Sequence, residues 1–262
     1  MDSQSKLGGA VLFLFAHQDD EFGVFSQITN EVRAGRRVYC AYFTDGSATA
    51  QPDRREREST RVLRSLGVVT EDILFVGRSL SIQDLKLIDH TEAAANWLQA
   101  FLVERSAIDE CFVPAWEGGH PDHDMLHAIA VEVLSAKSPD IDIWQFPLYN
   151  GQGCRGPFFR LQSPLVENGP VKQTAIFWRD RWRFVFLCLG YPSQWRSWLG
   201  LFPAACMNYL LFGVQQLQRT NRVRLGFPPH KRPLYYERRG FAVWHDVLRA
   251  ITRHGESLLS RQ

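Results

Sequence analysis

Short apolar runs alternate with amphipathic segments over the first 150 residues, and this alternation constrains the fold more than any other feature. Runs that are apolar throughout are typical of strands buried on both faces, and the segments between them carry apolar residues at helical spacing. Strands that alternate with helices need crossover connections, which favour a parallel, doubly wound sheet. The predicted strands are 11–15, 38–43, 73–76, 110–114 and 141–146, and the predicted helices are 22–33, 54–66, 92–103 and 123–136.

The alternation ends near residue 150. Residues 150–156 form a glycine-rich turn, and aromatic side chains crowd the segments that follow. We expect an α/β fold with a Rossmann-like, mostly parallel sheet over residues 1–150. Residues 151–262 should be an aromatic and basic part of the same domain that packs on the sheet and walls the substrate pocket. Neither glycine-rich nucleotide-binding loop is present in the sequence.

The net charge of +2 hides a division between the two halves of the chain. Residues 151–262 contain 17 lysines and arginines against 5 acidic residues, whereas residues 1–150 contain 13 against 23. Such asymmetry indicates either an anionic partner or two halves that neutralise each other across an internal interface. The arginines at positions 179, 181, 183, 219, 222 and 224 could form an anion-binding wall or a solvated face.

The cysteines and the apolar segments bear on the location of the protein. Five scattered cysteines without a CxxC pair favour buried free thiols in a reducing compartment, so we expect a cytoplasmic protein. The polar stretch Met1–Gly9 lacks the pattern of a signal peptide. The apolar stretch 198–214 contains Pro203 and Asn208 and is too short for a transmembrane span. We predict a core or interfacial helix there, with a membrane-peripheral location as the alternative.

Two clusters of ionisable residues follow predicted strands. His17, Asp19, Asp20 and Glu21 come directly after the first strand, and the cluster 118–124 follows the strand 110–114. Ligands of open α/β sheets bind at the carboxyl ends of the strands, so the two clusters can meet across a crevice. Histidine and carboxylate are ligands expected for zinc, and three protein ligands plus a water form a catalytic zinc site. The sequence therefore predicts a catalytic metal centre.

The two clusters resemble the motifs of a known family. Ala16–Glu21 is similar to the Ala-His-Pro-Asp-Asp-Glu motif of the PIG-L or LmbE-like zinc-dependent de-N-acetylases, and His120–His123 matches their His-Pro-Asp-His motif. These enzymes act on N-acetylglucosamine conjugates. Three further segments are similar to the family: Thr44–Gly46, Arg55-x-x-Glu58 before the Leu66-Gly67 pair, and Tyr191–Gln194. The likeness is continuous over roughly the first 150 residues and scattered thereafter.

The resemblance implies a division of labour among the ionisable residues. It implies His17, Asp20 and His123 as ligands of Zn²⁺ or of another divalent metal such as Fe²⁺. Asp19 would be the general base on the metal-bound water. His120 would stabilise the tetrahedral intermediate or protonate the leaving amine, and Asp122 would orient the imidazole of His120. The reaction would be metal-assisted hydrolysis of an N-acetyl amide to a free amine and acetate.

The resemblance also implies residues that bind the substrate. Arg55 is a candidate for gripping hydroxyl or phosphate oxygens, and Tyr191 and Gln194 are candidates for binding the sugar. The substrate would be an N-acetylated glycoconjugate, and the basic second half favours an anionic or lipid-linked one. Gln18 stands where the family usually has proline, so the turn loses the stiffness that proline gives it while the ligands stay the same.

Two other functions fit parts of the sequence. His17-x-Asp19 with a distant histidine also satisfies the two-histidine, one-carboxylate pattern of non-haem iron oxygenases, which resemblance places on an all-β double-stranded helix. A non-catalytic anion-binding protein would instead use the basic second half. No nucleic-acid-binding motif is present, so nucleic acid is not an expected partner. The sequence leaves the oligomeric state open.

Overall fold

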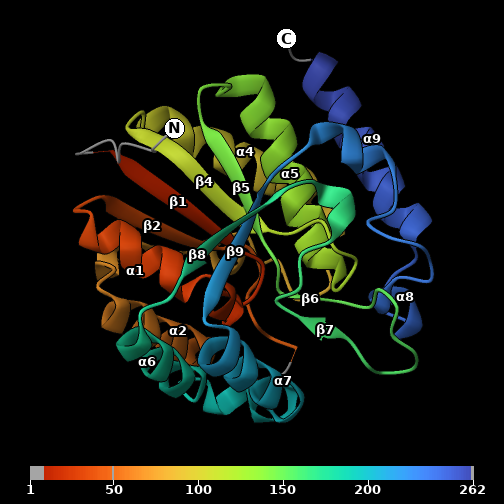
Figure 1. Ribbon diagram of the computed structural model, residues 1–262. Helices are drawn as coiled ribbons and strands as arrows, with labels where there is room; N and C mark the ends of the chain where they lie inside the picture. The colour runs from red at the N-terminus through yellow and green to blue at the C-terminus, as the bar shows by residue number, and fades with distance from the viewer. Residues whose placement is uncertain (1–8, 49, 261–262) are drawn as a thin grey trace.

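The core of the protein is a seven-stranded sheet with the order β3-β2-β1-β4-β5-β9-β8 (Figure 1). The computed structural model describes residues 9–48 and 50–260. The strands of this sheet are β1 (Ala10–Phe15), β2 (Arg37–Tyr42), β3 (Ile73–Phe75), β4 (Ile108–Pro114), β5 (Asp142–Phe146), β8 (Val171–Ala175) and β9 (Val214–Arg219). A separate pair is formed by β6 (Tyr149–Asn150) and β7 (Arg160–Leu161). The polar stretch from residue 1 to residue 8 lies outside the described residues.

The five strands predicted from the sequence form the parallel part of the sheet. The apolar side chains of β1, β2 and β4 are buried on both faces, as the runs without alternation indicated. The bounds of the five strands differ from the prediction by one or two residues, and the third ends early because Val76 begins the short helix α3 (Val76–Ser79). The prediction of a Rossmann-like, mostly parallel sheet is therefore confirmed.

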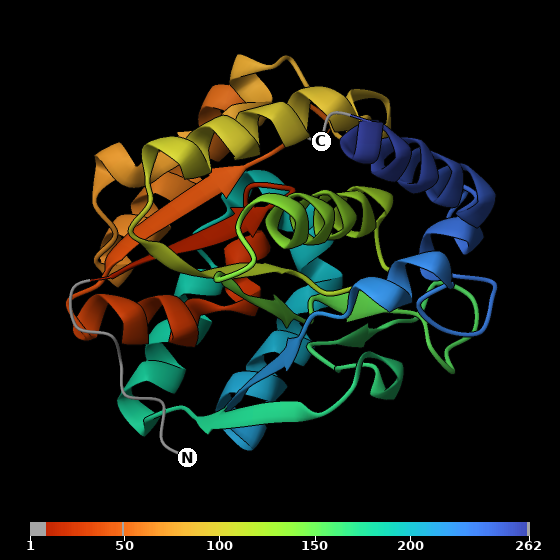
Figure 2. The same ribbon diagram turned by 90° about the horizontal axis from the view of Figure 1, so that it is seen from above.

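Helices cover both faces of the sheet (Figures 1 and 2). The helices are α1 (Phe25–Arg33), α2 (Pro52–Leu66), α4 (Thr91–Glu104), α5 (Pro121–Lys137), α6 (Trp178–Cys188), α7 (Trp195–Met207), α8 (Tyr235–Arg238) and α9 (Trp244–Ser260). One apolar cluster joins β1 to α4, α5 and α9, and a second joins the opposite face of β1 to α1, α2, α6 and α7. α2 ends at Gly67, whose φ of 102° suits the left-handed position after a helix.

The C-terminal half contributes two strands that the sequence analysis did not predict. β9 pairs antiparallel with β5, and β8 pairs antiparallel with β9. The pattern of β9 is hard to read because it contains the buried polar residues Gln215 and Gln218. Gln215 donates to the carbonyl of Gly23, and Gln218 donates to the carbonyl of Leu165. These partners satisfy the side-chain N–H groups of both glutamines, which helps a polar strand to lie inside the sheet.

The order of the strands creates a crevice beside β1. The chain runs from β1 outward through β2 to β3 and then returns to the other side of β1 with β4. The connections after β1 and β4 therefore leave the carboxyl edge of the sheet at its topological switch point, where α/β proteins bind ligands. Both ionisable clusters follow these two strands.

Residues 198–214, the apolar stretch considered above for contact with a membrane, are mostly helical. α7 and the π-helical turn Asn208–Phe212 form this stretch. Among the described residues, no helix has both the length and the hydrophobicity that crossing a bilayer requires.

The close approach of Gly77 to Thr44 gives a prediction about stability. A Cβ atom on Gly77 would lie 2.3 to 2.5 Å from backbone atoms of Thr44, so Gly77→Ala should destabilise the fold by about 1–3 kcal/mol. Gly200 in α7 has open space around it, so Gly200→Ala should be neutral or stabilising by up to about 1 kcal/mol. Chemical denaturation of both variants measures the difference. Equal stability of the two variants would contradict the packing described here.

Candidate metal centre

Three side chains converge at the carboxyl edge of β1 and β4. His17 lies just beyond β1, Asp20 begins a short 3-10 helix (Asp20–Gly23), and His123 lies in the first turn of α5. The Nε2 atom of His123 is 3.1 Å from Nδ1 of His17 and 3.1 Å from Oδ1 of Asp20. All three residues are buried, and one ligand atom from each lies within 4.8 Å of the others. The structure thus brings together the three predicted metal ligands.

Asp122 holds the far side of the His17 ring. Its Oδ2 atom is 3.1 Å from Nε2 of His17, and it accepts hydrogen bonds from the backbone N–H groups of Leu85 and Leu87. A histidine that ligates a metal typically donates its other ring N–H to a carboxylate in this way. The sequence analysis expected Asp122 to orient His120 instead, but the ring of His120 lies 3.7 Å from the carboxylate.

The donor set suits a cation. Two imidazole nitrogens and a carboxylate oxygen face one buried point, so a cation or a shared proton is needed to offset their repulsion. Burial opposes a charged imidazole, but the hydrogen bonds with Asp122 and Asp20 outweigh it and raise the pKa of His17 well above the usual value. Burial likewise opposes ionisation of Asp20, yet His123 and His17 hold the pKa of Asp20 well below its usual value. The residues therefore fit a divalent metal.

Asp19 sits beside the three ligands in an unusual backbone conformation. Its φ is 123°, a region that costs a non-glycine residue about 1–3 kcal/mol. The carboxylate of Glu21 accepts the backbone N–H of Asp19 at 3.0 Å and holds this turn. Burial raises the pKa of the Asp19 carboxyl to about 7, against the opposing charge of Arg55. Asp19 is less completely buried than Asp20, so its carboxylate can meet a substrate.

Arg55 supports the turn that carries Asp19. Its guanidinium donates to the carbonyl of Gln18 at 2.7 Å, to the carboxylate of Asp19 at 3.3 Å and to that of Asp84 at 3.1 Å. Only 4% of the Arg55 side chain is exposed. The structure therefore gives Arg55 contacts within the protein, and its predicted contact with substrate stays a prediction.

His120 caps the N-terminus of α5. Its Nδ1 atom accepts the backbone N–H of Asp122 at 3.2 Å, so the proton of a neutral ring resides on Nε2. Burial and the neighbouring His17 hold the pKa of His120 well below its usual value. The ring of His120 packs edge-on to that of His17, with 4.5 Å between the centroids. A neutral imidazole with a donor at Nε2 therefore adjoins the ligands.

Several carboxylates that the sequence analysis assigned no role hold the loops at this edge. Asp84 accepts from the hydroxyl of Thr44 and from the backbone of Gly46. Glu117 accepts the backbone N–H groups of residues 148 and 149, and Asp124 accepts those of residues 117 and 118. Asp124 directly follows the second motif, and this position could have indicated a role near the metal centre. No local pattern marks Asp84, because its partners are distant in sequence.

Tyr149 is a second residue that the sequence analysis missed. Its ring packs edge-on to that of His123, with 5.5 Å between the centroids. Burial, followed by the negative charge of Asp20, raises the pKa of the Tyr149 phenol well above its usual value. In the sequence Tyr149 stands just before a glycine-rich turn and belongs to neither ionisable cluster, so nothing there indicated its contact with His123. The phenol remains protonated and lies at the edge of the candidate metal centre.

His127 lies one helical turn beyond His123 but does not join the centre. Its Nδ1 atom is 2.8 Å from the carbonyl oxygen of Pro114, and its ring packs against Trp116. Burial lowers the pKa of His127 to about 4, so the ring is neutral. His127 is therefore a hydrogen-bonded core histidine.

Comparison with protein families agrees with the geometry of these motifs. Residues 12–134 match the family model of PIG-L, described as GlcNAc-PI de-N-acetylase. This part of the chain, just under half of its length, is similar to the PIG-L family. The match contains both ionisable clusters and the strands that carry them. No curated protein is similar to the chain in sequence.

Solved structures share the fold of the chain. A triple mutant of a deacetylase of teicoplanin biosynthesis is 14% identical with a TM-score of 0.59, and the alignment covers 81% of this chain and 98% of that one. The N,N'-diacetylchitobiose deacetylase of Pyrococcus horikoshii is 17% identical with a TM-score of 0.58, covering 85% and 88%. A conserved protein of Thermus thermophilus is 17% identical with a TM-score of 0.57, covering 86% and 98%.

The segment Tyr191–Gln194 lies beyond the PIG-L match and packs against it. Tyr191 is buried and stacks on Trp198. Glu58 accepts hydrogen bonds from the backbone and hydroxyl of Ser193. Gln194 lines a hollow of about 740 Å³ that also includes residues 54 and 196. Sugar binding by Tyr191 and Gln194 stays a prediction.

Gln18 stands where the similar motif has proline, and its side chain makes a hydrogen bond. Its side-chain amide donates to the carbonyl of Thr44 at 2.9 Å. The backbone N–H of Thr44 donates to the carbonyl of Ala16 at 2.9 Å. The glutamine therefore links the first motif to the turn after β2, where proline would stiffen the chain without such a bond.

The hydrogen bond between Asp122 and His17 gives a prediction about metal affinity. Asp122→Asn should weaken zinc binding about 10- to 100-fold, because loss of a carboxylate that orients a ligating histidine has that effect. Competition with a chromophoric chelator measures the affinity. Asp89→Asn, an exposed change beyond the centre, is the control and should bind zinc like the unmodified protein. Unchanged affinity in Asp122→Asn would show that Asp122 does not support a ligand.

Proposed function

We propose that the protein is a zinc-dependent deacetylase that hydrolyses the N-acetyl amide of an N-acetylglucosamine-type conjugate to a free amine and acetate. This proposal rests on the close approach of His17, Asp20 and His123, with the carboxylate of Asp19 next to them in the chain. The PIG-L match and the deacetylases with the same fold support it.

His17, Asp20 and His123 would hold the ion and leave a position open to solvent or substrate. A divalent ion bound there would act as a Lewis acid and lower the pKa of a water to about 7. With an ion bound, Asp122 would keep the remaining proton of the His17 ring on Nε2, and the Nδ1 lone pair would face the ion. The protein thus presets the ring orientation before any ion binds.

Asp19 is the residue suited to move a proton in this reaction. Arg55 faces its Oδ1 atom, so Oδ2 is the oxygen left to accept a proton from the attacking water. The hydrogen bond from the backbone N–H of Asp19 to Glu21 and the contact with Arg55 would hold this carboxylate in place. A positioned general base of this kind contributes about 10²- to 10⁴-fold to the rate.

His120 is suited to assist the other side of the amide. Its Nε2–H can donate a hydrogen bond to the oxygen on which negative charge develops. To protonate the leaving amine, the ring would first have to take up a second proton, which the lowered pKa of His120 disfavours. Preorganised donors aimed at developing charge are a large source of catalysis in acyl transfer. The backbone N–H of Asp122 at the N-terminus of α5 fixes the tautomer that this hydrogen bond to the developing charge requires.

The oxygenase alternative fits the structure less well. It required Asp19 as the ligand, whereas Asp20 joins both histidines and Asp19 pairs with Arg55. It also required an all-β double-stranded helix, and the sheet here is mostly parallel with helices on both faces. Zinc in the purified protein and activity without an oxo-acid cosubstrate would separate the two functions.

Substitutions at Asp19 and His123 test which residue acts as the base and which holds the metal. Asp19→Asn should keep zinc bound and lower kcat by about 10²- to 10⁴-fold, because it removes the base and leaves the ligands. His123→Ala should lose both zinc and activity. Acetate release and metal content are measured together, with the exposed Asp53→Asn as control. Full activity in Asp19→Asn would refute the proposed mechanism.

A substrate panel tests the reaction itself. We expect acetate release from at least one of N-acetylglucosamine, N,N'-diacetylchitobiose and an N-acetylglucosaminyl phosphatidylinositol. A chelator should abolish the release and added zinc should restore it, since hydrolysis depends on the ion. A zinc-bound protein that releases acetate from none of them would instead favour the non-catalytic binding alternative.

A further inference from the structure

Helix α6 turns aromatic side chains away from the protein. Trp178, Trp182 and Phe186 follow one another at intervals of four residues, which places them on one face of the helix. All three are exposed, and Phe186 reaches 66%. The opposite face of α6 is already packed, because Phe184 and Cys188 are buried in the second apolar cluster. The aromatic stripe is therefore a second apolar face without a partner among the described residues.

Helix α7 and the π-helical turn after it repeat the pattern. Trp195, Leu199, Met207 and Leu211 are exposed at multiples of four residues, and Leu199 and Leu211 reach 69% and 72%. Trp198 on the other side is buried and packs edge-on to Phe22, with 5.3 Å between the centroids. The two helices adjoin each other (Figure 1). We call the exposed residues of these stripes the α6–α7 surface.

Patches of this kind on a protein surface usually mark an interaction site. Their chemistry here is mixed. From residue 168 to residue 236 the sequence contains ten lysines and arginines and a single acidic residue, Asp180. Asp180 is buried and pairs with Arg33 at 2.6 Å. Arg179 and Arg196 are exposed within the stripes and make no ion pair with a described residue. The surface therefore combines exposed aromatic rings with unneutralised positive charge.

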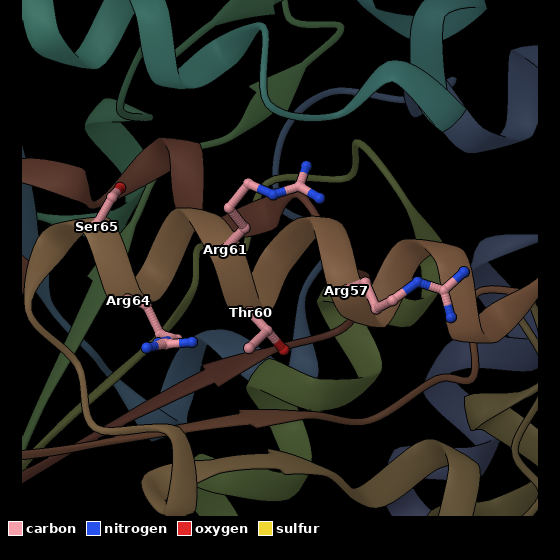
Figure 3. Close-up of a pocket in the computed structure, with 5 residues that line it drawn as sticks. All are labelled: Arg57, Thr60, Arg61, Arg64 and Ser65. Carbon is pink, nitrogen blue, oxygen red and sulfur yellow. The ribbon is translucent and has the colours of Figure 1, made fainter.

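Helix α2 extends the positive charge beside α6. Arg57, Arg61 and Arg64 project from α2 around a hollow of about 480 Å³ (Figure 3). They are exposed and make no ion pair with the described residues. Arg183 of α6 donates to the carbonyl of Ser65 at the end of α2, so the two helices are tied together. The arginines of α2 thus form a basic border to the α6–α7 surface.

We propose that the α6–α7 surface docks on the face of an anionic lipid bilayer. Tryptophan, phenylalanine and leucine on the outer face of a helix enter the boundary between headgroups and acyl chains, and adjacent arginines bind anionic lipids. A tryptophan suits this boundary because its ring is apolar and its N–H can reach water or a headgroup. This surface lies outside the metal centre, and its use does not depend on the reaction proposed above.

A second copy of the chain is a poorer occupant of the same surface. A symmetric dimer would place each patch against itself. The arginines of both copies would then meet across the interface, with no exposed acidic residue between positions 168 and 236 to pair with them. Charge complementarity therefore favours a surface of opposite sign.

Vesicle binding tests the proposal directly. The full chain is mixed with vesicles of phosphatidylcholine alone, or with about one third phosphatidylglycerol, and then floated on a density gradient. We expect the chain to float with the anionic vesicles and far less with the neutral ones. The tryptophan emission should shift to the blue on binding, and added salt should weaken the association because it screens the arginines.

Two sets of variants separate the apolar and the charged contributions. Trp178→Ser, Trp182→Ser and Phe186→Ser combined, and Arg61→Gln with Arg179→Gln, should each lower vesicle partitioning by about tenfold or more. The matched controls are Val103→Ser on α4 and Lys137→Gln at the end of α5, both exposed elsewhere, which should bind like the unmodified protein. Thermal unfolding and zinc affinity of each variant verify that the fold is intact.

Three results would overturn the proposal. These are no flotation with anionic vesicles, equal flotation with neutral vesicles, and binding that the folded variants leave unchanged. Light scattering that detects a dimer, lost in the aromatic variant, would assign the surface to a second copy instead. Acetate release from a soluble substrate is measured in parallel, so that failure to dock and failure to hydrolyse are distinguished.

Discussion

The parallel pairing of β1 with β4 determines where the metal centre can form. Phe13 in β1 lies opposite Phe112 in β4, and their rings stack with 4.6 Å between the centroids. Because the strands are parallel neighbours, the chain leaves both of them at the same edge of the sheet. His17 and His123 are 106 positions apart in sequence, yet their ring nitrogens come within 3.1 Å. The ligands depend on this strand pairing, and no local segment could assemble them.

Buried carboxylates convert this edge into a rigid site. Asp84, Glu117, Asp122 and Asp124 each accept backbone N–H groups from irregular loops. A buried carboxylate without partners would be costly, and the loop N–H groups need acceptors as well. Each bond therefore satisfies both groups and fixes the conformation of one loop. The strained turn at Asp19 is tolerated because such a framework surrounds it.

The sequence predicted the parallel part of the sheet and the meeting of the two ionisable clusters for related reasons. Apolar runs identify strands that are buried on both faces, and the polar clusters directly follow such runs. The hydrogen bond of Asp122 to His17 was not expected, because it crosses from one motif to the other, and the predicted role of Asp122 toward His120 stays a prediction. Asp84 and Tyr149 were missed because their partners are distant in sequence. β9 was missed because its glutamines are satisfied only by tertiary contacts, which no periodicity reveals.

The charge asymmetry has two explanations, an internal interface that neutralises it and an anionic partner, and they apply to different parts of the molecule. Near β5 and β9 the halves do neutralise each other, since Arg219 pairs with Asp142 and Arg222 with Glu132. Other acidic residues of the first half pair within that half, since Arg36 binds Glu31, Asp109 and Glu110. The arginines around α6 and α7 lie apart from these pairs, so their charge faces solvent beside exposed rings. The inner face of α7 packs against the residues that follow β1, and its outer face is apolar and basic. Substitutions on the two faces should therefore act independently.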